Sequence, residues 1–306
     1  MTLLSIIISL LSEQVRPLAV GRVDGWLDAW AEFLESQFNA GKHGHGISAW
    51  MVGAALPTLL VFGLYLALLS SNWVVAVVFN VGVLYLTTGF RQFSHFFTDI
   101  QLALRMGEVE RARDLLAEWR GSSGDRLNSD EIARLAIEQA LMSSHRHVFA
   151  PFFWFALLGP AGAVLYRLVR HFERAWGGVR GNDYGEFGEF ARRIFAAIDW
   201  VPVRLTAAAF AVVGDFEDAV FCWRSQAGRW PEESAGILLA TGAGALGVRL
   251  GMPVRADDDF GTRPELGVGE DADPDVMQST IGLVWRTLVM ALLLLALLGV
   301  AGWVGK

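Results

Sequence analysis

The stretch HRHVFAPFFWFALLGPAGAVLYR, residues 145–167, passes from a cationic cluster into an apolar run, breaks at Gly159-Pro160 and ends in an arginine. It is long enough to cross about 30 Å of hydrocarbon, but arginines flank both ends, so positive charge gives it no consistent orientation. Broken backbone at membrane depth is tolerated where it is buried in protein or lines a cavity. We therefore expect segment 148–169 either to span the membrane or to turn back at Gly159-Pro160, and the pattern favours the broken form.

The composition is typical of a membrane protein. Of the 306 residues 53% are hydrophobic, and the mean hydropathy of +0.39 lies well above that of a typical soluble chain. The net charge of -7 argues against non-specific nucleic-acid binding. A single cysteine, Cys222, excludes an internal disulfide and a cysteine-based zinc site. We predict an all-α, polytopic helical membrane protein with three to five membrane segments, the lipid bilayer as its surroundings and no nucleic-acid partner.

Apolar and polar stretches alternate along the chain and divide it into six parts. They are an N-terminal short apolar helix with an amphipathic interfacial helix (1–47), a transmembrane hairpin (48–90), a helical insert (91–147), a membrane core with the broken segment and a glycine-rich helix (148–254), an acidic loop (255–282) and a C-terminal transmembrane helix (283–306). The insert is rich in arginine, and the positive-inside rule places it in the cytoplasm. The expected location of the protein is the bacterial inner membrane.

The insert and the core contain shorter helices. We expect two amphipathic helices around Gly107 and a further helix over 130–147, with Ser129 as its N-cap. Two apolar stretches, 200–213 and 235–251, each carry an arginine and are marginal for spanning, so half-buried helices fit them. A charge within an apolar stretch is costly and marks a functional site by default. Pairing with a buried carboxylate is the structural alternative for both arginines.

Several local motifs occur in an order that resembles a known family. They are Ala150-Pro151, the Pro-Ala-Gly-Ala of 160–163, the Pro-x-Arg-Leu-Thr of 202–206, the Ala-Gly-Ala-Leu-Gly-Val of 243–248 and the DFGTRPELG of 259–267. Together they cover about residues 100–290 and resemble the CobD/CbiB family. That family contains adenosylcobinamide-phosphate synthases, membrane enzymes of cobalamin biosynthesis that join an aminopropanol unit to a corrinoid carboxylate. The resemblance implies magnesium and ATP as cofactors.

The same resemblance implies acidic residues that this chain lacks. The synthases carry Glu-Ser-x-Ala-Glu-Asn-x-x-Asp-Gly where this chain has EQALMSSHRH, residues 138–147, so that Glu138 is kept and Arg146 replaces an aspartate. After the broken segment, Glu173 is the only acidic remnant. Mg²⁺ binds through carboxylates and water, and an arginine in its site would repel the ion. The resemblance therefore favours a protein without a metal, a resident cofactor or synthase activity.

Other details resemble the AmpE branch of this superfamily, which is associated with β-lactamase induction and cell-wall signalling. They are Arg146 shortly before APFFW, the DWVPVRL of 199–205 and the early acidic residue Glu13. The favoured interpretation is an AmpE-like regulatory protein that binds a ligand and catalyses no reaction. The alternative is a divergent CobD/CbiB-type ligase that forms an amide with magnesium and ATP. A third possibility is a membrane scaffold that binds a signalling partner or a second copy of itself.

Eight residues are candidates for ligand binding: Glu138, His145, Arg146, His147, Arg167, Glu173, Arg204 and Arg249. The four arginines are expected to meet an anionic small molecule in one polar cavity that faces the cytoplasm, and the two glutamates would balance part of their charge. The adjacent residues 145–147 point in different directions on a helix and form no single metal site; they can also simply mark the membrane interface. The sequence indicates no catalytic residue.

Overall fold

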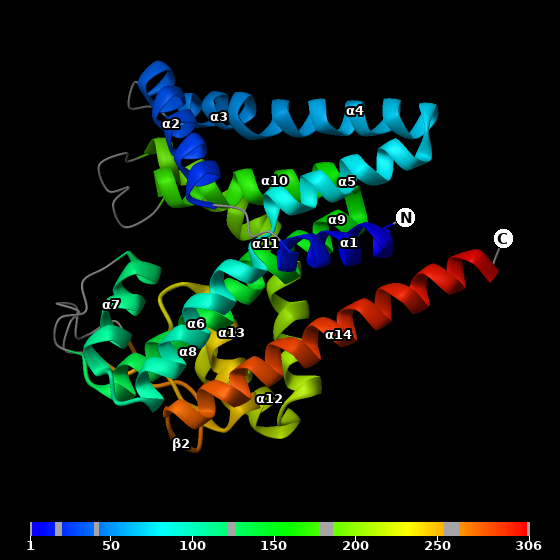
Figure 1. Ribbon diagram of the computed structural model, residues 1–306. Coiled ribbons are helices and arrows are strands. Elements are labelled where there is room, and N and C mark those ends of the chain that lie inside the picture. The colour runs from blue at the N-terminus through cyan, green and yellow to red at the C-terminus, as the bar shows by residue number, and fades with distance from the viewer. Residues whose placement is uncertain are drawn as a thin grey trace. The chain divides into compact units, whose positions relative to one another are not determined.

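The computed structural model describes residues 2–15, 20–39, 43–121, 127–177, 186–253 and 263–304 (Figure 1). The chain forms two compact units. Unit 1 comprises Met1–Gly89 and Ala150–Pro202, and unit 2 comprises Phe90–Phe149 and Val203–Lys306. The first part of the predicted acidic loop, residues 255–262, lies outside the described residues.

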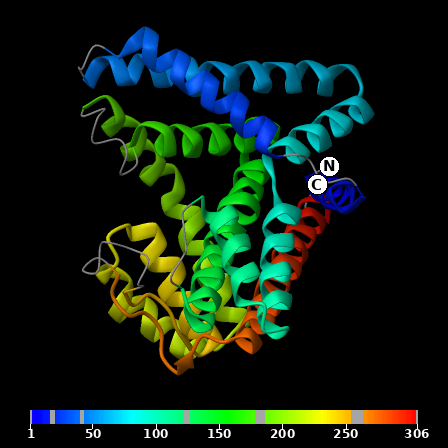
Figure 2. The same cartoon turned by 60° about the vertical axis from the view of Figure 1, so that its left-hand side comes forward.

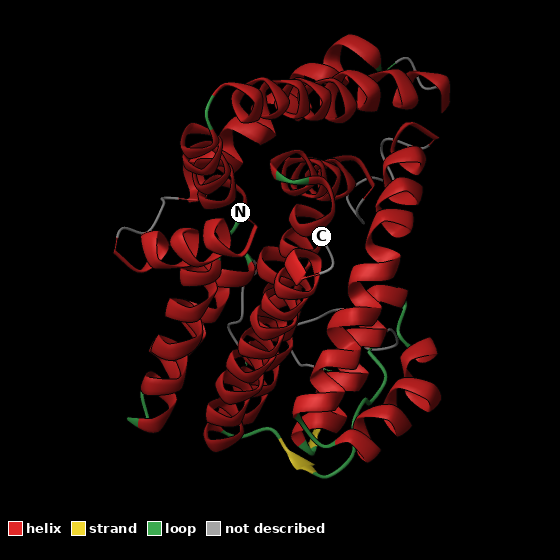
Figure 3. Ribbon diagram, turned by 90° about the vertical axis from the view of Figure 1, so that its right-hand side faces the viewer, coloured by secondary structure: helices red, strands yellow, loops and turns green. Residues whose placement is uncertain are grey.

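Both units are built almost entirely from helices, which confirms the all-α prediction (Figure 3). The elements of unit 1 are α1 (Thr2–Val15), α2 (Val20–Phe38), α3 (His43–Trp50), α4 (Leu56–Ser71), α5 (Trp73–Thr87), α9 (Ala150–Leu158), α10 (Pro160–Phe172) and the first part of α11 (Glu186–Val213). The elements of unit 2 are α6 (Phe90–Arg105), α7 (Val109–Arg120), α8 (Ser129–Ser144), the rest of α11, α12 (Phe216–Gln226), α13 (Glu233–Leu246), β1 (Val248–Arg249), β2 (Glu270–Asp271) and α14 (Pro274–Val304).

Among the described residues, three helical segments are long and apolar enough to cross a membrane: Gly44–Ser71, Glu186–Val213 and Pro274–Gly302. Helix α4, within the first of them, has no buried residue, which fits contact with lipid. The predicted span over 73–90 is the 15-residue helix α5, which is shorter than the roughly 20 residues that a span needs. The apolar stretch 200–213 is the second half of the longer α11, and Pro202 lies inside that helix. The protein is a membrane protein.

The predicted break in segment 148–169 is present. Helix α9 ends before Gly159, whose φ of 64° and ψ of -150° no continuous helix could include, and Pro160 begins α10. A Cβ atom at Gly162 would lie 2.1 Å from the carbonyl oxygen of Trp154, so α10 packs closely against α9 only because glycine stands there. Segment 148–169 thus forms two helices, α9 and α10, that are separated by the break at Gly159. That it turns back within the membrane stays a prediction.

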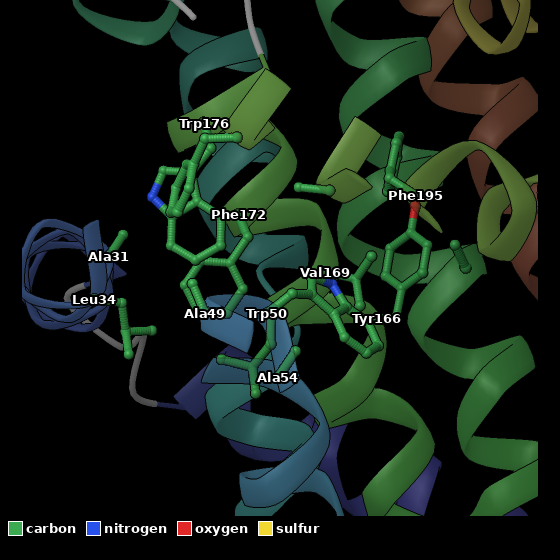
Figure 4. Close-up of a cluster of buried hydrophobic side chains, with 14 residues drawn as sticks. Ala31, Leu34, Ala49, Trp50, Ala54, Tyr166, Val169, Phe172, Trp176 and Phe195 are labelled. Carbon is green, nitrogen blue, oxygen red and sulfur yellow. The ribbon is translucent and has the colours of Figure 1, made fainter. Parts of the chain in front are cut away.

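Aromatic side chains fill the interior of unit 1 (Figure 4). The rings of Phe172 and Trp176 stack with their centroids 4.3 Å apart, and Phe187 meets Trp176 edge-on at 5.2 Å. Leu34 of α2 packs against the same cluster. A Cβ atom at Gly53 would lie 2.8 Å from the ring of Phe172, so the backbone approaches the ring where only glycine fits. Packing of large rings at native density holds this unit together.

In unit 2, helices α6, α8 and α14 pack against one another, and α13 lies against α8 and α12 (Figure 2). The glycines of α13 permit this close packing, because they have no side chain to separate the helices. A Cβ atom at Gly242 would lie 2.6 Å from the side chain of Leu141, and one at Gly244 would lie 2.4 Å from the carbonyl oxygen of Asp218. The glycine-rich helix is therefore a packing element between its two neighbours.

The ends of the helices in unit 2 follow local capping rules, with two differences from the prediction. Helices α6 and α7 flank Gly107, as expected. Helix α8 is capped by Asn128, one residue before the predicted Ser129, because the Asn128 side chain accepts from the amide of Glu131 while the Glu131 carboxylate accepts from the amide of Asn128, both at 2.8 Å. Helix α13 ends at a left-handed Gly247, which places Arg249 on β1 and not on a helix.

Candidate functional site

Glu138 lies near the end of α8 at the centre of a junction in unit 2. Its carboxylate is 8% exposed and both oxygens are engaged. Oε1 accepts a hydrogen bond from the amide of Gly251 at 2.9 Å, and Oε2 accepts one from Nη2 of Arg263 at 2.6 Å. A buried carboxylate is tolerated only when it is paired and hydrogen-bonded in this way. We call Glu138, Gly251 and Arg263 the Glu138 junction.

Arg263 is held on more than one side. Its guanidinium is 13% exposed, and its Nε donates to the carbonyl oxygen of Met252 at 3.2 Å. The same guanidinium lies over the ring of Trp230, 5.5 Å from the ring centroid, where a cation is attracted by the π face. Arg263 therefore joins helix α8 to the chain that follows β1.

The backbone around the junction is sharply turned. Gly251 and Met252 have φ angles of 74° and 63°, and Met252 is the one non-glycine residue with positive φ among the described residues. A Cβ atom at Gly251 would lie 2.0 Å from the carbonyl oxygen of Pro264. Leu250 and Leu266 exchange backbone hydrogen bonds of 2.7 and 2.9 Å on either side of this contact. Gly251, three residues after the motif 243–248, and Arg263, in the described part of the motif 259–267, thus meet at Glu138.

Arg146, in the turn His145–Phe149 after α8, and Arg204 on α11 pair with carboxylates at the start of α13. Arg146 pairs with Glu232 at 3.1 Å and Arg204 pairs with Glu233 at 2.6 Å. The two glutamates are 51% and 73% exposed, so water screens both pairs and each contributes little to stability. Acidic residues at the start of a helix are also favoured by its dipole. The structure therefore provides carboxylate partners for two of the predicted arginines.

The remaining candidates of unit 2 are distributed around the same helices. His145 is buried, and its Nδ1 lies 3.0 Å from Oγ1 of Thr206 on α11. His147 is half-buried. Arg249 on β1 pairs with Asp271 at 2.9 Å and with Glu265 at 3.7 Å.

Two of the predicted residues belong to unit 1. Arg167 pairs with Asp24 of α2 at 2.6 Å, and its Nη1 donates to the carbonyl oxygen of Thr87 at 3.4 Å. Glu173 forms an ion pair with Arg170. Each predicted arginine therefore has a carboxylate partner within its own unit. That the eight candidates line one cavity stays a prediction.

Sequence reasoning missed Arg263, Gly251 and Trp230. Arg263 stands in a motif that carried the family resemblance and Gly251 lies three residues after another, but no periodicity links them to Glu138. Arg263 is 125 residues from Glu138 along the chain. One signal could have pointed to Arg263: Glu138, if it is buried, needs a cationic partner.

The described residues do not fit a magnesium ion at Glu138. Both of its oxygens are already occupied, and one of them faces a guanidinium. Among the residues that the structure describes, no group of three or more histidine, cysteine, aspartate or glutamate side chains could hold a metal. Cys222 on α12 is also unsuited to ligation or attack as a thiolate, because burial and the nearby Asp218 raise the pKa of its thiol to about 11.

The junction joins residues from three parts of the chain, at positions 138, 251 and 263. A comparison with protein families gives a match that includes all three. A family model described as "CobD/Cbib protein" matches residues 5–284. The chain belongs to the CobD/CbiB family. Its membership confirms the resemblance that the order of the motifs indicated.

Curated relatives extend over most of the chain. A protein named "Cobalamin biosynthesis protein CobD" from Stutzerimonas stutzeri is 35% identical over 277 residues, 89% of this chain and 88% of the relative. A protein of the same name from Chromobacterium violaceum is 35% identical over 237 residues, 76% of this chain and 75% of the relative. One from Mycobacterium tuberculosis is 33% identical over 171 residues, 54% of each chain. No solved structure matches this chain.

These relatives correct the function that the sequence favoured. The AmpE-like regulatory interpretation was wrong, since the CobD/CbiB relatives that match most of the chain are named for cobalamin biosynthesis. The error arose from reading the loss of acidic residues near Glu138 as the loss of activity. In the structure, Glu138 is retained as one partner of a buried ion pair with Arg263. The absence of the other acidic groups therefore says little about what this site does.

Proposed function

We propose that this protein is a CobD-type membrane enzyme of cobalamin biosynthesis that joins an amine to a corrinoid carboxylate as an amide. The observation that carries the proposal is the relative from Stutzerimonas stutzeri, which bears the CobD name and is 35% identical over 88% of its length. The motifs that meet at the Glu138 junction are a second support. The proposed location is the bacterial inner membrane, with the insert 91–147 in the cytoplasm.

The overall reaction is a condensation. A carboxylate and an ammonium group form an amide, and one carboxylate oxygen leaves as water with two protons of the ammonium group. This condensation is unfavourable in water, and the family resemblance implies ATP as the source of its free energy. Burial of the reacting groups excludes water as the competing nucleophile. An enzyme for this reaction must therefore hold two polar substrates in a shielded position.

In this proposal the Glu138 junction holds the substrate-facing loops and does not itself react. Its carboxylate is buried and each oxygen already accepts a hydrogen bond, from Gly251 or from Arg263, so protonation by a substrate would weaken the pair with Arg263. Its role is to fix the turn at 250–252 against the chain at 263–266. Rigid placement of loops is what a condensation between two bound substrates requires.

The test is complementation of a bacterial strain that lacks its CobD synthase. Expression of this protein should restore growth without added cobalamin. Membranes that contain the protein, supplied with an amine substrate, magnesium and ATP, should also convert a corrinoid carboxylate to its amide, as measured by mass spectrometry. Normal expression in the membrane with neither growth nor amide product would contradict the proposal.

A pair of glycine variants makes the test specific for the junction. Gly251→Ala should abolish complementation, because its Cβ atom would lie 2.0 Å from a carbonyl oxygen and its φ is 74°. Gly228→Ala in the same unit is the matched control, since nothing lies within 4 Å of a Cβ atom there. Equal complementation by both variants would remove the junction from the proposed mechanism.

A further inference from the structure

Arg134 lies one helical turn before Glu138 on α8 and has almost no polar partner. Its side chain is half-buried, and its Nε is fully buried without a hydrogen bond. Its Nη1 contacts only the sulfur of Met252, at 3.9 Å, and a thioether is a weak acceptor. Buried guanidinium groups are normally satisfied by carboxylates or phosphates. Within the described part of the chain, the guanidinium of Arg134 therefore keeps donors that an anionic ligand could use.

The acidic residues on the same helix face do not supply that partner. Asp130, Glu131 and Glu138 stand four or three residues away, the spacing at which helix pairs form. Glu131 accepts from the amide of Asn128, and Glu138 is engaged by Gly251 and Arg263. Asp130 is exposed and forms no ion pair with Arg134. Among the described residues, the charge of Arg134 is thus not neutralised.

A second guanidinium, that of Arg263, contacts the same residue. Arg263 donates to the carbonyl oxygen of Met252, whereas Arg134 contacts the sulfur of Met252. Both guanidinium groups stay positively charged at neutral pH, because arginine stays protonated, and Glu138 pairs with that of Arg263. Met252 holds a positive φ of 63°, a strained conformation that tends to persist at functional sites.

We propose that Arg134, with Arg263 behind it, is an oxyanion site that binds the phosphate group of a ligand. The planar donor fork of arginine matches the oxygens of a phosphate, and a partly buried site strengthens the attraction. The inference rests on the proposed function for the natural ligand, which would be a phosphate-bearing substrate, but the phosphate site itself can be tested alone. Arg134 would bind the ligand, and Arg263 would position the turn at Met252.

The experiment measures binding of inorganic phosphate to the full-length protein in phosphatidylcholine nanodiscs by calorimetry. Arg134→Gln should weaken phosphate binding at least tenfold, and Arg134→Lys should weaken it less because the charge remains. Arg111→Gln is the matched control: it removes an equal charge from an exposed arginine of the same unit that pairs with Glu108, and should change binding less than twofold. Thermal unfolding of each variant shows that it is folded.

Several outcomes would overturn the inference. Equal phosphate binding by the wild-type protein and a folded Arg134→Gln variant would do so, as would equal losses in Arg134→Gln and Arg111→Gln. Acetate should bind at least tenfold more weakly than phosphate, and equal binding would overturn the assignment to phosphate. Failure of the wild-type protein in complementation would contradict the proposed function and leave the phosphate result standing, so the two failures are distinguishable.

The same assay separates two sources of phosphate. In nanodiscs that contain phosphatidylglycerol, weaker binding of inorganic phosphate by both the wild-type protein and Arg111→Gln, whose site is intact, would support a lipid headgroup as the occupant of the site. Unchanged binding would support a water-soluble phosphate ester.

Discussion

The interiors of unit 1 and unit 2 depend on different chemistry. The cluster in unit 1 consists of stacked rings around Phe172 and Trp176, and its contacts are non-directional. The junction in unit 2 consists of one carboxylate, one guanidinium and one backbone amide around Glu138, and each contact has a fixed direction. An aromatic cluster accepts other side chains of similar volume, whereas a buried ion pair fails when either partner is lost. The comparison indicates that the aromatic cluster of unit 1 requires side chains of a given volume, whereas the junction of unit 2 requires its particular residues.

The largest effect is expected from Glu138→Ala. Removing Glu138 breaks a buried ion pair, which costs about 3–5 kcal/mol. The free energy of unfolding of the purified protein should fall by that amount, and complementation should be lost. A fully active Glu138→Ala protein with wild-type stability would show that the junction does not constrain unit 2.

A similar loss of stability with a different functional result is expected from Phe172→Ala. Removing a fully buried ring costs about 3–5 kcal/mol through lost contacts and the cavity left behind. Less protein should reach the membrane, but each folded molecule should keep its activity. Phe172→Leu is the control, since it retains much of the volume and should lose less stability. Reduced activity per folded molecule would break the distinction between the two units.

A smaller effect is expected from Arg204→Ala. Arg204 pairs with Glu233, which is 73% exposed, so the pair should contribute less than about 1 kcal/mol. The free energy of unfolding should change by no more than that. Glu233→Gln should behave alike if the pair is only structural. Loss of binding of an anionic ligand without loss of stability would instead support the sequence-based prediction for Arg204.

The smallest effect concerns acidification and His171. Burial lowers the pKa of His171 below 6.5, although Asp28 at 3.4 Å raises it in part. The unfolded chain therefore binds more protons than the folded chain once the pH falls below 6.5, so stability is present above that pH and is lost as the pH falls. The melting temperature should drop slightly between pH 7.5 and pH 5.5, and the drop should be smaller in His171→Gln. An equal drop in both proteins would assign the effect to other groups.

Local sequence signals predicted much of the fold. The break at Gly159, the turn at Gly107 and the apolar runs all depend on residues close together in the chain, where conformational preference decides the outcome. The full length of α11 was missed because Arg192 and Arg193 interrupt its apolar first half. The strand at Arg249 was missed because the sequence analysis did not place a helix end at Gly247 within the glycine-rich stretch.

The candidate site was only partly predictable, for a physical reason. Glu138 could be singled out from the sequence, but its partners come from segments more than 100 residues away. Such a pairing depends on how helices pack, which periodicity does not reveal. The arginines near apolar stretches were visible, whereas their exposed partners Glu232 and Glu233 were not, because surface acids follow no pattern.

The buried thiol of Cys222 has a practical consequence for topology. With its pKa raised to about 11, the only sulfhydryl of the chain stays protonated and shielded, so maleimide reagents should leave the unaltered protein largely unmodified. A cysteine introduced at an exposed position such as Glu110 would then be the one reactive label. Membrane-impermeant maleimide applied to intact cells and to inverted vesicles would report directly which side of the bilayer the insert faces.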